Sequence, residues 1–224
     1  MVTINIKLDI KKDAWNWWNA CNKISHGVDW KQRVGESLWK KIYGKTEKEA
    51  FKFLIPYLKK YYKEHKKVLE KNLAEAQKLF DDNAQEACSL MEKITGKQLY
   101  RKKFTCFLTT FPRCPYNYEK GYVWLCAVWS AKCYLGTFLH ELLHFQFIAY
   151  CKNKQPVKNL SPRQFEYLKE SLTVILNYEF KKYLCQKDKG YDLHQAFRKK
   201  LEILWQKNKN FNQLVKYGVE VLTT

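Results

Sequence analysis

The feature that most constrains this fold is the apolar segment 135–145, LGTFLHELLHF, in which polar side chains interrupt a run of leucine and phenylalanine. His140 and His144 stand four residues apart, and Glu141 directly follows the first histidine. Apolar residues surround these three on nearly every side, so a helix formed here must be buried. Buried polar groups are costly unless they are compensated. A bound metal would compensate them, and so would hydrogen bonds among ordinary core histidines.

The spacing of the three polar residues is typical of a zinc site. Helical residues four apart project from the same face, so both imidazoles can reach one ion at a Zn–N distance of about 2.0–2.1 Å. Glu141 is offset from His140 by about 100° around the helix. That offset keeps its carboxylate off the metal but beside it, where it can take a proton from water. The pattern therefore predicts His140 and His144 as zinc ligands and Glu141 as a general base.

A catalytic zinc usually has three protein ligands and leaves one position for water. An extended form of the motif would place a histidine six residues after His144, but that position is Tyr150. Glu170 stands at the entrance to the uncharged segment 171–178 and is predicted as the third ligand. Glu166, one turn earlier and nearer the exposed start of the helix, is the alternative.

The motif His140–His144 followed by Glu170 resembles the gluzincin branch of the zincin metallopeptidases, over roughly residues 121–180. The resemblance implies one Zn²⁺ per chain, bound by the two histidines and Glu170. It also implies a peptide or protein substrate whose bonds are hydrolysed by a water that Glu141 activates. Residues 121–129 would be an edge strand that pairs with the extended substrate.

The resemblance leaves open which residue stabilises the oxyanion of the reaction, a role that needs a further hydrogen-bond donor. Tyr167, Tyr178 and His194 are the candidates. Cleavage preference, and whether termini or internal bonds are cut, are also left open.

Hydropathy patterns predict an α+β fold, mostly helical with a small mixed β-sheet. Alternating residues 2–10 predict a strand, and residues 103–111 and 121–129 predict two more. Residues 13–97 have helical periodicity, with Thr46 and Glu49 as a capping box and Pro56 expected to break or kink the helix.

A later helix is predicted over residues 161–183, opened by Ser161, Pro162 and Gln164. The whole chain 1–224 is expected to form a single metallopeptidase-like domain. Residues 1–97 would be a strand plus a helical lobe, and residues 98–224 would hold the sheet, the motif helix and the C-terminal helices. The core would be zincin-like, with an active-site helix and a following glutamate helix.

The net charge of +19 favours a second hypothesis, a basic helical module that binds nucleic acid or an acidic protein partner and holds a structural zinc. Two observations weaken it. Only five of the 41 basic residues are arginine, the type suited to bidentate phosphate contacts. The charge run 59–67, KKYYKEHKK, is typical of a solvated helix face.

Eight cysteines without a CxxC pair indicate neither a zinc ribbon nor a disulfide scaffold. Reduced buried thiols are expected at Cys126, Cys133 and Cys151, although the even count leaves an extracellular version open. No signal peptide and no membrane-spanning segment are visible, so a cytoplasmic location and no membrane partner are expected. The oligomeric state is not indicated.

Overall fold

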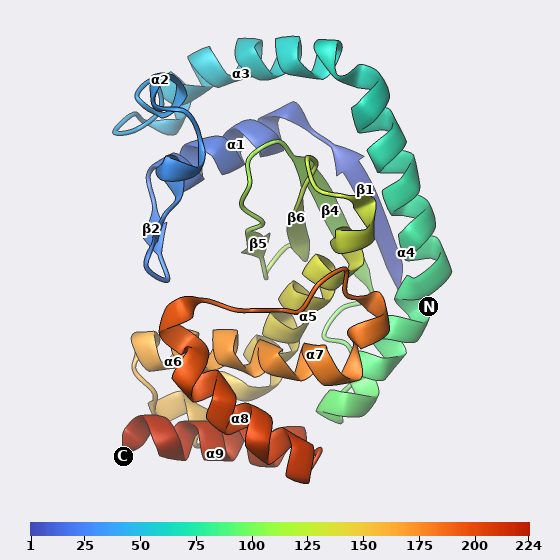
Figure 1. Ribbon diagram of the computed structural model, residues 1–224, viewed down its shortest axis with the longest axis vertical. Helices are drawn as coiled ribbons and strands as arrows, with labels where there is room; N and C mark the ends of the chain where they lie inside the picture. The colour runs from blue at the N-terminus through green and yellow to red at the C-terminus, as the bar shows by residue number, and fades with distance from the viewer. The chain divides into compact units, whose positions relative to one another are not determined.

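A computed structural model describes the whole chain, residues 1–224 (Figure 1). The predicted class is confirmed: the structure is α+β, mostly helical, with a four-stranded mixed sheet and a separate two-stranded sheet. The chain divides into two compact units. We call residues 3–82 and 103–134 the sheet unit, and residues 1–2, 83–102 and 135–224 the helical unit. The expectation of a single metallopeptidase-like domain stays a prediction.

The larger sheet lies in the sheet unit. Its strands are β1 (Thr3–Leu8), β4 (Lys103–Thr109), β5 (Tyr116–Asn117) and β6 (Tyr122–Cys126). They follow the order β1-β4-β6-β5, with β1, β4 and β6 parallel and β5 antiparallel to β6 (Figure 1). The predicted N-terminal strand is confirmed as β1, whose Ile4 and Ile6 are buried between exposed neighbours. The central strand β4 is buried on both faces from Cys106 onward.

The prediction that residues 121–129 form an edge strand is wrong for the first half of this segment. The strand β6 lies between β4 and β5, and the Trp124 amide donates to the Pro115 carbonyl at 2.9 Å. The segment before it folds back through a turn in which Gly121 has a φ of 64° and its amide bonds the Tyr118 carbonyl. The backbone of Tyr122–Trp124 is therefore already paired on both sides.

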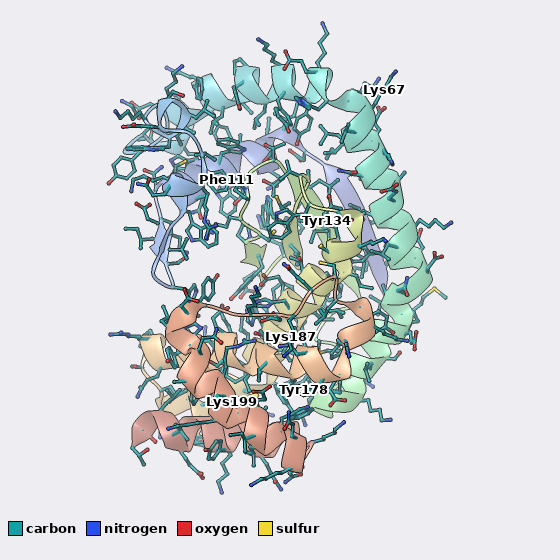
Figure 2. All side chains as sticks on the ribbon, viewed as in Figure 1. Lys67, Phe111, Tyr134, Tyr178, Lys187 and Lys199 are labelled. Carbon is teal, nitrogen blue, oxygen red and sulfur yellow. The ribbon has the colours of Figure 1, made fainter.

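Helices of the sheet unit pack around a shared core. They are α1 (Ile10–Cys21), α2 (Glu36–Trp39), α3 (Glu47–Glu64) and the first part of α4 (Lys66–Thr95), with 3-10 turns η1 (Trp30–Arg33) and η2 (Ala131–Cys133). The predicted capping box is confirmed, since Thr46 and Glu49 bond each other's backbone amides. The buried core residues, with Phe111 labelled in Figure 2, are Ala14, Trp17, Ala20, Cys21, Ile42, Ala50, Leu54, Leu58 and Phe111.

Two expectations for residues 13–97 are wrong in detail. A hairpin of β2 (Ile24–Ser25) and β3 (Val28–Asp29) interrupts the helical region, turning at His26 and Gly27. Both turn residues have positive φ, as a type I′ turn requires. Pro56 does not break α3, which continues to Glu64. The break comes instead at His65.

The helical unit carries the segment of greatest functional interest. Its helices are the end of α4, α5 (Tyr134–Cys151), α6 (Pro162–Leu172), α7 (Leu176–Glu179), α8 (Gln195–Lys207) and α9 (Phe211–Thr223). Its 3-10 turns are η3 (Val157–Asn159), η4 (Thr173–Ile175), η5 (Lys181–Tyr183) and η6 (Asp192–His194). Helices α6, α8 and α9 pack against one another (Figure 1). Gly218 permits the closest approach, because a Cβ there would lie 2.5 Å from the Leu168 side chain.

The predicted helix over residues 161–183 begins as expected but is not continuous. Ser161 and Gln164 form the capping box, with Pro162 in the first turn. The α-helix ends at Leu172 and passes through η4 into the short α7. The Thr173 hydroxyl donates to the Glu170 carbonyl at 2.8 Å, a local bond that competes with the regular helical pattern.

Six cysteines are free thiols: Cys21, Cys88, Cys106, Cys114, Cys126 and Cys151. Cys133 takes part in a disulfide bond, so the expectation of a reduced thiol is wrong for this residue. None of the helices has both the length and the hydropathy needed to span a bilayer.

A fully buried carboxylate ties α1 to the end of β4. Asp13 accepts hydrogen bonds from the Thr109 hydroxyl at 2.6 Å, from the Thr110 amide at 3.0 Å and hydroxyl at 2.8 Å, and from the Tyr62 hydroxyl at 3.1 Å. Burial raises the pKa of Asp13 from 3.8 to about 6, although these bonds oppose the shift. The folded state therefore holds the Asp13 proton more tightly than the unfolded chain does.

This burial makes stability depend on pH. The stabilisation from protonated Asp13 is fully present below the unfolded pKa of 3.8 and is lost as pH rises through about 6. We expect the free energy of unfolding of the wild type, relative to Asp13→Asn, to fall by about 2 kcal/mol between about pH 4 and pH 7. Urea unfolding of both proteins across this range measures the difference. A difference that stays constant with pH would show that Asp13 is ionised throughout.

Candidate metal centre

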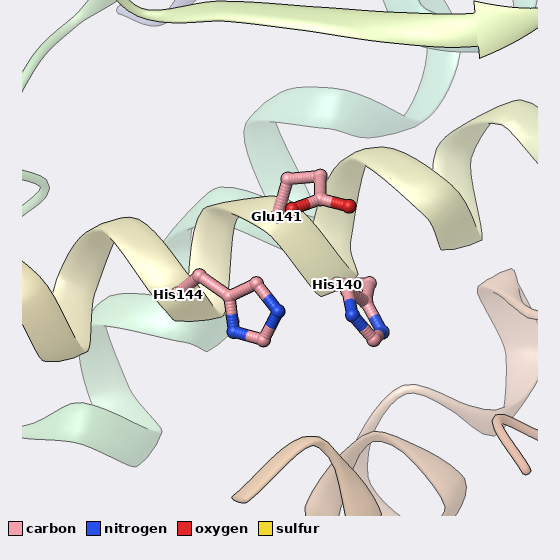
Figure 3. Close-up of side chains that lie close together, drawn as sticks. All are labelled: His140, Glu141 and His144. Carbon is pink, nitrogen blue, oxygen red and sulfur yellow. The ribbon is translucent and has the colours of Figure 1, made fainter. Parts of the chain in front are cut away.

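The motif helix α5 places the predicted ligands within an apolar shell. Six of its apolar residues, distributed around the helix, are almost fully buried: Phe138, Leu139, Leu142, Leu143, Phe145 and Phe147. Figure 3 shows the rings of His140 and His144 pointing to the same side of the helix, while Glu141 projects from a different face. The ring centroids lie 4.5 Å apart and the planes are nearly perpendicular. The ligand atoms of these three side chains lie within 4.8 Å of one another.

The structure brings Glu170, on α6, to both histidines. Its Oε2 lies 3.6 Å from Nε2 of His140, and its Oε1 lies 3.3 Å from Nε2 of His144. The Glu170 side chain is 7% exposed, whereas that of Glu166 is 48% exposed and pairs with Lys169 at 2.7 Å. Of the two acidic residues considered from the sequence, Glu170 is therefore the one that faces the histidine pair.

These donor positions suit a metal ion. Two nitrogen or oxygen ligands of a tetrahedral zinc, each about 2.0–2.1 Å from the ion, lie about 3.3 Å from each other. The two nitrogen–oxygen distances of 3.6 Å and 3.3 Å are close to that separation. Imidazole nitrogen with carboxylate oxygen is also a ligand set that zinc accepts. The His/Glu cluster could hold a metal ion.

Asp188 supports His140 from the side away from Glu170. Its Oδ2 lies 2.5 Å from Nδ1 of His140, so the two ring nitrogens face different carboxylates. Just before the loop that carries Asp188, the chain passes close to α5 at Leu184. A Cβ on Gly136 would lie 3.0 Å from the Leu184 side chain. Metal-binding histidines commonly donate their second ring nitrogen to a carboxylate in this way.

The charges of the cluster favour ligand-competent forms of Glu170 and His144. Burial raises the pKa of Glu170, but hydrogen bonds from His140 and His144 and the charge of Lys169 outweigh burial and hold this pKa well below its ordinary value. Burial lowers the pKa of His144 to about 4, which leaves its ring neutral at pH 7. Glu170 is therefore a carboxylate and His144 a neutral imidazole, the forms that bind metal ions.

His140 and Glu141 are shifted in the opposite direction. Burial lowers the pKa of His140, but the carboxylates of Asp188 and Glu170 raise it well above its ordinary value overall. A metal ion that binds Nε2 of His140 would displace the proton on that nitrogen, because a nitrogen that ligates a metal carries no proton. Burial raises the pKa of Glu141 from 4.5 to about 7, so this carboxyl group can both take up and release a proton near neutral pH.

Two of the three candidates for an oxyanion donor use their hydroxyl groups in other hydrogen bonds. The Tyr167 hydroxyl donates to the Leu193 carbonyl at 2.6 Å, and the Tyr178 hydroxyl bonds Glu202. His194 precedes α8 but is buried, with its ring 4.5 Å from that of Tyr167. The two tyrosine hydroxyls are thus bonded to residues other than Glu170, His140 and His144.

Sequence reasoning missed Asp188 and the residue that holds it, Arg198. Neither residue lies in a recognisable motif, and 48 positions separate Asp188 from His140. The only available signal was indirect: Thr173 and Asn177, which share a helix face with Glu170 in the sequence, are the residues that bond Asp188.

No protein-family model matches this chain, and comparison with curated proteins and with solved structures gives no match either.

Proposed function

We propose that this chain is a zinc-dependent metallopeptidase of the gluzincin type. The observation that carries the proposal is the convergence of Glu170 on the Nε2 atoms of both motif histidines. The position of Glu141, beside the ligands but on another face of the helix, adds the group that hydrolysis needs (Figure 3).

His140, His144 and Glu170 would hold one zinc ion per chain. When bound, zinc would lower the pKa of a coordinated water toward about 7 and polarise the carbonyl of the peptide substrate. Glu141 takes the proton from the attacking water and delivers it to the amine that leaves. Its pKa of about 7 suits both transfers, because an efficient general base and acid titrates near the working pH.

The ligand assignment predicts metal content. The wild type should bind about one zinc per chain. His144→Ala or Glu170→Gln should weaken zinc binding by more than about 100-fold, which exceeds the usual effect of losing a residue that only hydrogen-bonds to a ligand. Inductively coupled plasma mass spectrometry after dialysis against a chelator measures the retained metal. Glu166→Gln is the matched control, because that side chain is exposed and lies one turn from Glu170 on the same helix. Equal loss in both glutamate variants would contradict the assignment.

The role of Glu141 predicts a separation of metal binding from activity. Glu141→Gln keeps the size of the side chain but removes the proton acceptor. Hydrolysis of a peptide library should fall by about 10²–10⁴-fold while zinc content stays at the wild-type level. Full activity in this variant would remove Glu141 from the mechanism.

The basic binding module remains the second candidate, favoured by exposed lysines on α3 and α4. Lys67 points away from the chain in Figure 2. However, Lys60, Lys66 and Lys71 pair with glutamates one turn along the helix, which is typical of a solvated face. Nucleic-acid affinity that falls steeply with salt and survives zinc removal would favour the module. Chelator-sensitive cleavage of an unstructured protein would favour the peptidase.

A further inference from the structure

Asp188 uses both carboxylate oxygens within the helical unit. Oδ2 faces Nδ1 of His140 at 2.5 Å. Oδ1 accepts from Arg198 at 2.9 Å and lies 3.2 Å from the oxygen of the Thr173 hydroxyl. The side chain is only 11% exposed, so these contacts replace water almost entirely. The direction of the carboxylate is therefore set by three protein groups.

The backbone of Asp188 is held as firmly as its side chain. The Asn177 amide group donates to the Asp188 carbonyl at 2.9 Å, and the Asp188 amide donates to Oδ1 of Asn177 at 2.7 Å. Arg198 adds a bond to the same carbonyl at 2.7 Å. A loop residue bound in this way has little freedom to move its carboxylate away from His140.

Arg198, on α8, also contacts the segment that carries Glu170. Its Nη1 donates to the Glu170 carbonyl at 3.2 Å and to the Thr173 hydroxyl at 2.6 Å. The carbonyl lies in the last turn of α6, where helical carbonyls lack partners within the helix. The buried guanidinium group of Arg198 thus connects Asp188, which contacts His140, with the backbone of Glu170.

Gly190 provides the space for this bridge. A Cβ at this position would lie 2.8–2.9 Å from three atoms of the Arg198 guanidinium group, and the residue has a φ of 61°. Both observations exclude an ordinary side chain here. The planar fork of arginine, unlike the single ammonium of lysine, can bond Asp188 and Glu170 at the same time.

We propose that Asp188 is a positioning residue that accepts the Nδ1 proton of His140 and thereby presents Nε2 to the metal, and that Arg198 holds Asp188 and Glu170 in register. This inference rests on the proposed zinc site. It adds residues that lie outside the motif and assigns Arg198 a role that operates through Asp188 and through the backbone of Glu170.

A double-mutant cycle on zinc affinity tests the proposal. Asp188→Asn and Arg198→Lys should each weaken zinc binding by about 10–100-fold in competition with a fluorescent chelator. Because Arg198 and Asp188 belong to one hydrogen-bonded network, the loss of affinity in the double variant should be smaller than the product of the two single losses. Arg163→Lys, an exposed arginine on α6, is the control and should bind as the wild type does. Multiplied effects in the double variant, or wild-type affinity in either single variant, would overturn the inference.

Proton and ¹⁵N NMR of the zinc-free protein gives a readout that is independent of metal and activity. The wild type and Arg163→Lys should show a His140 ring N–H signal, at Nδ1, that exchanges slowly with water, and Asp188→Ala, which has no acceptor at this position, should lose it. Persistence of the signal in Asp188→Ala would overturn the inference while leaving the zinc site intact. A wild type that shows the signal but binds no zinc would instead overturn the proposed function, and the role of Asp188 in metal positioning with it.

Discussion

The placement of one buried carboxylate against two imidazoles is the interaction on which the proposed site depends. A carboxylate as buried as that of Glu170 is costly unless cations or hydrogen-bond donors compensate for its lost hydration. The elements around it supply that compensation from fixed positions. The apolar shell of α5 surrounds the histidines, and α6 places Glu170 against them. The same interaction explains why polar side chains are tolerated inside an otherwise apolar helix.

Local patterns predicted the parts of the site that local geometry determines. Spacing along one helix was enough to place His140 and His144 on a common face, because helical periodicity does not depend on the rest of the fold. The choice of Glu170 over Glu166 rested on the uncharged residues 171–178 that follow it, and the structure buries the first six of them. The capping residues at Ser161 and Thr46 were likewise readable, since a cap bonds backbone only three residues away.

Features that depend on distant residues were not readable. Asp188 meets His140 across 48 positions, and nothing in the residues around Asp188 signals that contact. At the end of α6, Thr173 bonds the Glu170 carbonyl, and Arg198 bonds both Thr173 and Glu170. This network has no local sequence pattern from which the end of the helix at Leu172 could be predicted. The hairpin at His26 and the pairing of β5 with β6 were missed because strands this short carry almost no periodicity. Pro56 shows the opposite case, a strong local signal that the surrounding helix overrides.

The charge balance of the site links its support to its chemistry. Glu170 and Asp188 remain ionised beside His140, so the cluster could hold a cation. Burial raises the pKa of Glu141 to about 7, so this group can exchange a proton near neutral pH. Anomalous diffraction at the zinc absorption edge, from crystals grown with zinc, tests this account most directly. We expect one strong peak per chain bonded to His140, His144 and Glu170. A peak bonded to other residues, or no peak between these side chains, would contradict it.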